Sequence, residues 1–384
     1  MSDNNVNLLK FLIDNCEKAS PEEQIAAAAF FQKAADLGNA AAQSELGRCY
    51  LKAIGVTPDF ALAFKYYKLG ADKGNAAGQF GLGWCYESGQ GVTKDLTMAV
   101  KYYQLAADQG NPKAQSNLGR CYQNGLGVTK DLTMAVKYFQ LAADQGNSIA
   151  QINLGNLYEF GQGLTQDLTM AVKYYQLVAD QGNAYGQVNM GYSYVTGRGV
   201  NQDPTLAVKY YQLAVDQGDS MAQAGMGYLY ENGFGVEKDI FQAVKLYNLS
   251  ADQGDASGQY KLGSCYEQGL GVTLDLEKAV DIYQKSALQN YSPSQAALAE
   301  LYLSGAGLTK DSDKAAELYA KAVPSLAQNS DKGDPDSSWM LGKLYELGHG
   351  VAQDLTKAAS FYKLAASSGC LAAKDALERL KKTA

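Results

Sequence analysis

The sequence predicts an all-α protein, a solenoid of nine 36-residue helix-turn-helix repeats with capping helices at its ends, and three observations lead to this. Residues 93–111 and 129–147 are identical except at Tyr103 and Phe139. Within each repeat, small and apolar residues follow helical spacing, and paired glycines interrupt them. An aspartate also recurs every 36 residues, with one longer step of 43 before the last: Asp59, Asp95, Asp131, Asp167, Asp203, Asp239, Asp275, Asp311 and Asp354. Such an array can reach 384 residues without dividing into separate cores, because each repeat adds to the stack.

The first 39 residues predict an N-terminal cap. Residues 4–18 are amphipathic, with Leu9, Leu12, Ile13 and Cys16 on the apolar side. Residues 21–39 have the pattern of a degenerate second helix. We therefore expect residues 1–39 to hold a cap helix and a half repeat, because a solenoid needs polar ends.

Each full repeat predicts two helices, which we call A and B. Helix A of residues 112–123 follows Asn111 and Pro112, an N-cap with proline at the first helical position. It ends at Gly125 and Gly127, because glycine permits the positive φ of a tight reversal. Helix B follows the capping Asp131 and extends to residue 145.

Helical spacing also predicts how the two helices pack. Ala99, Tyr103 and Ala107 share one face of helix B, and Gly119 lies on the matching face of helix A. We expect the small residues to let the helices approach and the tyrosines to fill the gaps. Asp108 lies in the last turn of helix B, where the helix dipole disfavours an anion. We therefore expect it to have a specific partner, such as free amides of a neighbouring repeat.

The repeats are expected to occupy residues 40–369. The longer step before Asp354 corresponds to seven inserted residues, which we place in the polar tract near 324–334. Residues 370–384 predict a C-terminal cap helix.

Composition and charge exclude several classes of protein. The net charge of −7 argues against a nucleic-acid partner or an anionic membrane surface. No apolar stretch approaches the eighteen residues of a membrane span, and no Sec-type signal precedes the repeats. We expect a cytoplasmic protein and a monomer. Four cysteines occupy one repeat position, at 49, 85, 121 and 265, and equivalent atoms of stacked repeats lie about 8–10 Å apart, too far for a disulfide.

The sequence offers few groups for catalysis. The only histidine, His349, occupies the variable middle of a glycine turn, and we expect it to be exposed to solvent. The glycine turns lack the Gly-Lys-Ser/Thr ending of a phosphate loop. We expect no cofactor, no metal site and no enzymatic activity.

The repeat resembles a known family. The pattern AxxxLGxxYxxGxGVxxDxxxAxxYYxxAADxG, as in residues 114–146, is similar to the Sel-one-like repeat (SLR), a relative of the tetratricopeptide repeat. The resemblance implies a right-handed α-α superhelix that serves as an adaptor or scaffold for protein complexes. Family members act in signalling, in protein quality control and in bacteria that live inside host cells. Delivery into a host cell would follow only if this chain came from such a bacterium.

Unequal variation between the helices indicates where a partner would bind. The stretches 75–92 and 111–128, which contain helix A, match at nine of eighteen positions, whereas the helix B stretches match at eighteen of nineteen. By analogy with tetratricopeptide proteins, helix A lines a concave groove. Trp, Tyr and Arg, which dominate binding hot spots, recur on its variable face. The predicted protein-binding residues are Arg48, Phe80, Trp84, Arg120, Ile152, Asn156, Phe160, Tyr185, Tyr192 and Tyr228.

These observations favour a non-catalytic scaffold that binds a protein segment along the groove, in signalling or in contact between a pathogen and its host. One alternative is a hydrolase or a small-molecule-binding protein that uses the same groove. Another is relaxed constraint on a face that packs against nothing.

Overall fold

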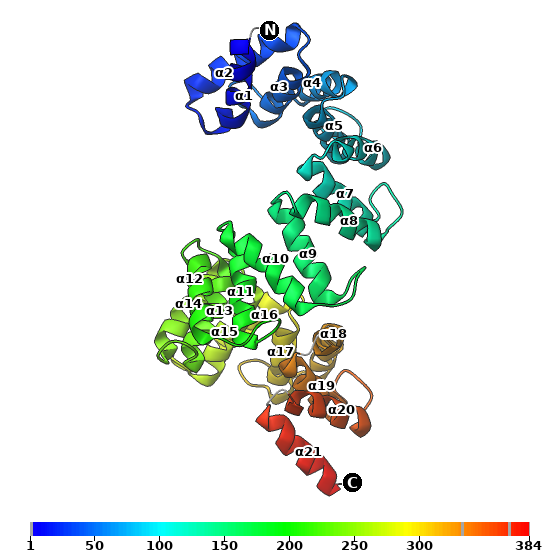
Figure 1. Ribbon diagram of the computed structural model, residues 1–384. Coiled ribbons are helices and arrows are strands. Elements are labelled where there is room, and N and C mark those ends of the chain that lie inside the picture. Colours follow the sequence, from blue (N-terminus) through cyan, green and yellow to red (C-terminus); the bar gives the residue numbers. More distant parts are fainter. Residues whose placement is uncertain (1–2, 332–333, 368–369, 384) are drawn as a thin grey trace. The chain divides into compact units, whose positions relative to one another are not determined.

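The computed structural model describes residues 3–331, 334–367 and 370–383 (Figure 1), and within these ranges every regular element is a helix. The chain forms two compact units, residues 1–181 and 182–384, and each is described by itself. Both consist of alternating A and B helices, as predicted. The right-handed course of the superhelix stays a prediction.

The first unit begins with the cap elements α1 (Asp3–Asn15), η1 (Cys16–Lys18) and α2 (Pro21–Asp36). Its A helices are α3 (Ala40–Lys52), α5 (Ala76–Ser88), α7 (Pro112–Asn124) and α9 (Ser148–Phe160). Its B helices are α4 (Phe60–Asp72), α6 (Leu96–Asp108), α8 (Leu132–Ala143) and α10 (Leu168–Asp180).

The second unit continues the alternation. Its A helices are α11 (Ala184–Thr196), α13 (Ser220–Asn232), α15 (Ala256–Gln268), α17 (Ser292–Ser304) and α19 (Pro335–Leu347). Its B helices are α12 (Pro204–Val215), α14 (Ile240–Asp252), α16 (Leu276–Ala287), α18 (Ser312–Asp331) and α20 (Leu355–Ser367). The last helix is α21 (Leu371–Thr383).

The predicted caps set the helix ends. The Asn111 side chain accepts a hydrogen bond from the backbone N–H of Ala114 at 3.0 Å, with Pro112 at the first helical position. The helix closes at Gly125, whose φ is +71°. Asp131 caps α8 by accepting from the N–H of Met134 at 3.0 Å. Helix α8 ends at Ala143, two residues before the predicted boundary.

In most repeats, an aromatic ring of helix B packs against a glycine of helix A. A Cβ added at Gly83 would lie 2.8 Å from the ring of Tyr103, and one at Gly119 would lie 2.8 Å from the ring of Phe139. Tyr103 and Phe139 are fully buried. Glycine on helix A therefore admits the aromatic residue of helix B, and the expected packing is confirmed.

The neighbouring tyrosine of helix B forms a second, partly exposed contact. Its ring stacks on the tyrosine near the end of helix A, as in Tyr86 and Tyr102, whose centroids are 5.8 Å apart with planes 3° from parallel. The same stack joins Tyr50 with Tyr66, Tyr122 with Tyr138, Tyr158 with Tyr174 and Tyr194 with Tyr210. Much of the tyrosine excess thus has a structural explanation.

The recurrent glutamines connect helices through buried hydrogen bonds. Gln115 of α7 donates to the carbonyl of Ala107 in the preceding repeat at 3.3 Å, and it accepts from Gln145 at 2.8 Å. Gln151 has the same pair of contacts, with Ala143 and Gln181. A buried amide without partners is costly. These bonds therefore explain why the glutamine of helix A and the glutamine after helix B both recur.

The partner of Asp108 differs from our expectation. Its Oδ1 accepts from Nε2 of Gln104, one turn earlier in the same helix, at 2.5 Å, and not from amides of another repeat. Gln104 in turn accepts from the hydroxyl of Tyr138 in the next repeat at 2.9 Å. A neutral glutamine amide thus offsets the unfavourable position of the carboxylate, and the tyrosine links it to the neighbouring repeat.

The lengthened segment near 324–334 continues a helix. Helix α18 has 20 residues, against 12 or 13 in the other B helices of the repeats, and it contains Pro324. Residues 332 and 333 lie outside the described part. At its end, the buried hydroxyls of Ser330 and Ser338 are 2.7 Å apart and join α18 to α19. In the described ranges, no helix combines the length and the apolar character that a membrane crossing would need.

Candidate functional site

The ten predicted binding residues all lie on A helices, but they are divided between the two units. Seven belong to the first: Arg48, Phe80, Trp84, Arg120, Ile152, Asn156 and Phe160. Tyr185, Tyr192 and Tyr228 belong to the second. Four pairs of A helices from neighbouring repeats contact one another, α3 with α5, α7 with α9, α11 with α13 and α13 with α15, whereas B helices mainly contact A helices. At these junctions the A helices lie on the inner side of the local curvature.

Several of these residues have contacts within the chain. Arg48 faces the N-terminal cap, where its guanidinium donates to Glu17 and Glu45 at 2.6 Å and to the carbonyl of Ile13 at 3.2 Å. Asn156 accepts from the hydroxyl of Tyr175 at 2.8 Å. These two residues have structural partners, so a binding role is not required to explain them.

The aromatic residues differ in exposure. Phe80 is half-buried and packs 5.9 Å from the Tyr103 ring, and Ile152 is also half-buried. Phe160, Tyr185, Tyr192 and Tyr228 are exposed, at 38 to 41% of their surface. Many other large apolar side chains of the chain are exposed to a similar degree. The ring of Tyr228 also has the Nζ of Lys261 5.1 Å from its centroid.

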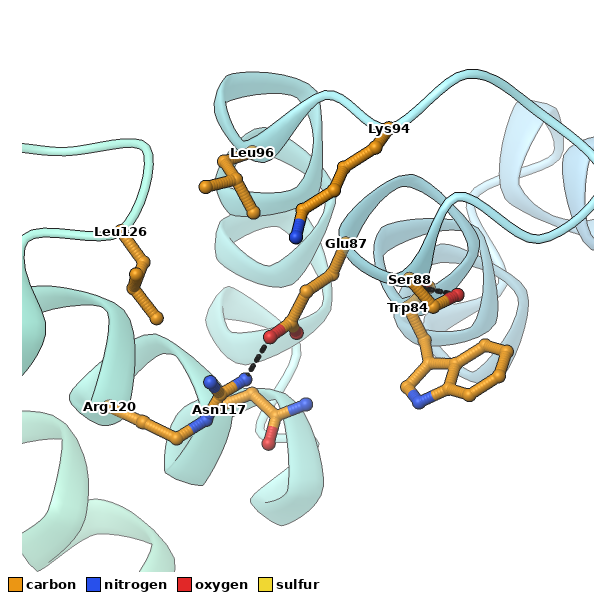
Figure 2. A pocket seen from close by; sticks show the side chains of 8 residues that line it. All are labelled: Trp84, Glu87, Ser88, Lys94, Leu96, Asn117, Arg120 and Leu126. Carbon is orange, nitrogen blue, oxygen red and sulfur yellow. Dashed lines mark hydrogen bonds and ion pairs between the residues drawn. The ribbon is translucent and has the colours of Figure 1, made fainter.

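A pocket of about 470 Å³ lies between helices α5 and α7, beside the glycine loops that follow them. Figure 2 shows Arg120 reaching Glu87 across it, with Lys94 approaching the same carboxylate from the loop. Leu96 and Leu126 lie on one side, and the Trp84 indole lies on the other. The lining consists of Trp84, Glu87, Ser88, Lys94, Leu96, Asn117, Arg120 and Leu126.

Two predicted residues, Trp84 and Arg120, therefore meet in one site, whereas the other eight do not line it. The prediction missed Glu87, Lys94 and Asn117. Glu87 stands three residues after Trp84, so helical spacing alone could have placed it on the same face. Lys94 comes from the loop before helix B, where helical spacing does not predict the direction of a side chain.

Glu87 is the electrostatic centre of the pocket. Its Oε2 accepts from the hydroxyl of Tyr103 at 2.6 Å, and its Oε1 accepts from Nη2 of Arg120. Burial raises the pKa of the Tyr103 hydroxyl, and the bond to Glu87 raises it further, so this hydroxyl remains a donor. Burial is the largest single influence on Arg120 and lowers the pKa of its guanidinium, but the hydrogen bond to Glu87 and the attraction of that carboxylate together raise the pKa above its usual value.

The same glutamate recurs with the same tyrosine contact. Each glutamate accepts from the buried tyrosine of its own repeat at 2.6 to 2.7 Å, in the pairs Glu159 with Tyr175, Glu231 with Tyr247, Glu267 with Tyr283 and Glu346 with Tyr362. Two of these glutamates also pair with a cation from the second helix along the chain: Lys261 of α15 lies 3.3 Å from Glu231 of α13, and Arg379 of α21 lies 2.7 Å from Glu346 of α19. Where helix B has Phe139, helix A has Gln123 in place of glutamate. At the single difference between the two near-identical segments, the hydroxyl and the glutamate that would accept from it are therefore absent together.

We predict that Tyr103→Phe lowers the free energy of unfolding by about 1.5 kcal/mol, because a hydrogen bond to a charged group contributes about that much. Tyr67→Phe is the matched control: Tyr67 is the buried tyrosine of the repeat that has Leu51 in place of the glutamate. We expect the control to change the stability by less than about 0.5 kcal/mol. Urea unfolding followed by circular dichroism measures both, and equal losses would show that the bond to Glu87 contributes nothing.

The groups that could support catalysis are placed as follows. We expected His349 to be exposed to solvent, but it is partly buried. Its ring lies 5.2 Å from that of Tyr319, and its Nδ1 is buried without a hydrogen-bond partner among the described residues. Burial raises the pKa of Cys85 to about 12 and that of Cys121 to about 11, so both thiols are protonated at neutral pH. No group of three or more His, Cys, Asp or Glu suited to a metal occurs in the part of the chain that the structure describes.

The fold and its repeated contacts define a helical-repeat solenoid. The family model for the Sel1 repeat matches residues 19–39, 40–75, 76–111, 112–147, 148–183, 184–219, 220–255, 256–291, 292–323 and 335–370. The chain belongs to the Sel1 repeat family. Solenoids of this type generally mediate protein interactions as non-catalytic scaffolds.

Two solved structures are similar over long stretches. One is c5321, described as a protective antigen present in uropathogenic Escherichia coli strains, with 29% identity, 98% of this chain and 91% of that chain covered, and a TM-score of 0.60. The other is a Sel1 repeat protein from Oxalobacter formigenes, with 33% identity, 62% of this chain and 94% of that chain covered, and a TM-score of 0.58. No match was found among curated proteins.

Proposed function

We propose that this protein is a non-catalytic scaffold that binds an extended protein segment along the exposed faces of its A helices. In the first unit, the pocket between α5 and α7 is the anchoring point. In the second unit, the exposed Tyr185, Tyr192 and Tyr228 form the corresponding surface.

One contrast supports the proposal. The residues that recur in helix B have structural roles: Asp95 caps α6, Tyr103 fills the space over Gly83, and Gln109 bonds to Gln79. At the position of Trp84 on helix A, the next three repeats have Arg120, Asn156 and Tyr192, so no common packing role explains their identity. Large aromatic residues that vary on a uniform frame are typical of a surface adapted to a ligand.

The volume of the pocket, about 470 Å³, also falls in the range of small-molecule sites. This is the one observation that favours the alternative of a small-molecule-binding protein or hydrolase. Turnover of any member of a broad substrate panel, lost on changing a carboxylate of the surface such as Glu300, would support that alternative.

We predict that Trp84→Ala with Arg120→Ala, and separately Tyr192→Ala with Tyr228→Ala, reduce recovery of partner proteins at least tenfold, as truncating hot-spot residues does. Partners are recovered from a lysate of the source organism and quantified by mass spectrometry. The matched control is Leu105→Ala with Leu141→Ala, which removes leucines exposed by 41 and 42% on B helices. Unchanged recovery by both surface variants, with wild-type circular dichroism, would refute the proposal.

The proposal also covers the setting in which the scaffold acts. The E. coli relative is described as a protective antigen, which fits contact with a host. Signalling rests on family membership alone. A cytoplasmic, monomeric state without nucleic acid remains part of the proposal, and sedimentation of the purified chain tests the monomer.

A further inference from the structure

The pocket between α5 and α7 combines an excess of positive charge with an apolar wall. We propose that it receives a carboxylate side chain, aspartate or glutamate, of the bound segment, next to an aliphatic residue of that segment. The proposal rests on the function proposed above and specifies the chemistry of the partner at one point.

The pocket lining has an excess of positive charge. Two cations, Lys94 and Arg120, and one anion, Glu87, line the pocket, so it has one net positive charge in a chain whose net charge is −7. Both Glu87 oxygens are already engaged, by Tyr103 and by Arg120. Arg120 thus balances the charge of the Glu87 carboxylate, and the positive charge of Lys94 remains.

Arg120 and Lys94 have hydrogen-bond donors that could bind a ligand. A guanidinium has five N–H donors, and one nitrogen of Arg120 is bonded to Glu87. Lys94 extends from the exposed loop toward the same region (Figure 2). A carboxylate that enters between these two cations would accept charge-assisted hydrogen bonds and would make the pocket neutral.

The walls of the pocket are apolar on both sides of the charged groups. Leu96 and Leu126 lie on one side of the charged groups, and the half-buried Trp84 lies on the other (Figure 2). An aliphatic residue next to the acidic one would bury apolar surface against them. A peptide can supply both an anionic and an aliphatic side chain to one pocket.

Other ligands fit less well. A basic segment would place its charge against Lys94 and Arg120. A nucleic acid presents a phosphate at every step of its backbone and needs an extended basic surface, whereas this pocket offers two cations. One net positive charge matches one carboxylate better than a doubly charged phosphate.

The test uses the full chain and a library of random 12-residue peptides, each fused at both ends to a carrier so that no free carboxyl terminus is present. We expect the wild-type protein to enrich peptides in which Asp or Glu stands beside Leu, Ile, Val or Phe. Lys94→Glu should abolish this enrichment. The control, Lys130→Glu, makes the same change at the equivalent exposed loop position of the next repeat.

Affinity of one selected peptide is then measured through Trp84 fluorescence in a Trp339→Phe background, because the chain has only these two tryptophans. Lys94→Glu should weaken binding at least tenfold, and Lys130→Glu less than twofold. Enriched peptides without acidic residues, equal binding by both variants, or tighter binding of a phosphoserine version would overturn the proposed carboxylate while leaving the scaffold function standing. A wild-type protein that enriches no peptide at all would overturn both.

Discussion

Gly91→Ala should lower the free energy of unfolding by about 3 kcal/mol, through backbone strain of about 1 kcal/mol and overpacking of about 2 kcal/mol. Gly91 is the second glycine of its turn and has a φ of +73°. A Cβ there would lie 2.0 Å from the carbonyl oxygen of Phe60, in the first turn of α4 of the preceding repeat. Neither group can move aside as a flexible side chain would, because the clash is with backbone.

The first glycine of the same turn provides the matched control. Gly89 has a similar φ of +75°, but a Cβ there would lie 3.3 Å from the Lys94 side chain. The chain itself places Ala53 at this position of an earlier repeat, with a φ of +58°. We therefore expect Gly89→Ala to cost only about 1 kcal/mol.

Urea unfolding gives the difference between the two variants, and amide hydrogen exchange shows whether the weakening is local to α4 and α5. A repeat array need not unfold in one step, so the exchange measurement matters. Equal losses for Gly89→Ala and Gly91→Ala would mean that the close approach to Phe60 is unimportant.

The comparison of these two glycines shows how much of the fold the sequence could predict. The period, the caps and the all-α class follow from local rules, since Asn111, Asp131 and Gly125 act on their own helix. The sequence does not show that the second glycine is needed for contact with another repeat, because both glycines recur almost equally. Only the contact with Phe60 distinguishes them.

The same distinction applies to the candidate site. Helical spacing was sufficient to place Trp84 and Arg120 on one variable face. It could not show that Arg48 has its partners in the N-terminal cap, because that contact joins residues about thirty positions apart outside the regular repeat. It also could not bring Lys94 to the pocket, because Lys94 lies in a loop and helical spacing applies only within a helix.

A second substitution tests the junction between repeats directly. Arg120→Glu should lower the free energy of unfolding by about 2 kcal/mol, because it removes an ion pair and places a second carboxylate against Glu87. The side chain of Glu87 is only 20% exposed, so water screens the repulsion poorly. Urea unfolding at low and high salt measures the loss, which should change little with salt because ions screen a partly buried pair poorly.

The next junction of the same chain supplies the control. There, Gln123 and Asn156 stand where Glu87 and Arg120 stand, and that pair of repeats packs without the two charges. The double variant Glu87→Gln with Arg120→Asn should therefore recover most of the stability that Arg120→Glu loses, because it leaves no unpaired charge between the helices. A double variant as unstable as the single one would show that the arginine contributes through the packing of its long side chain and not through its charge.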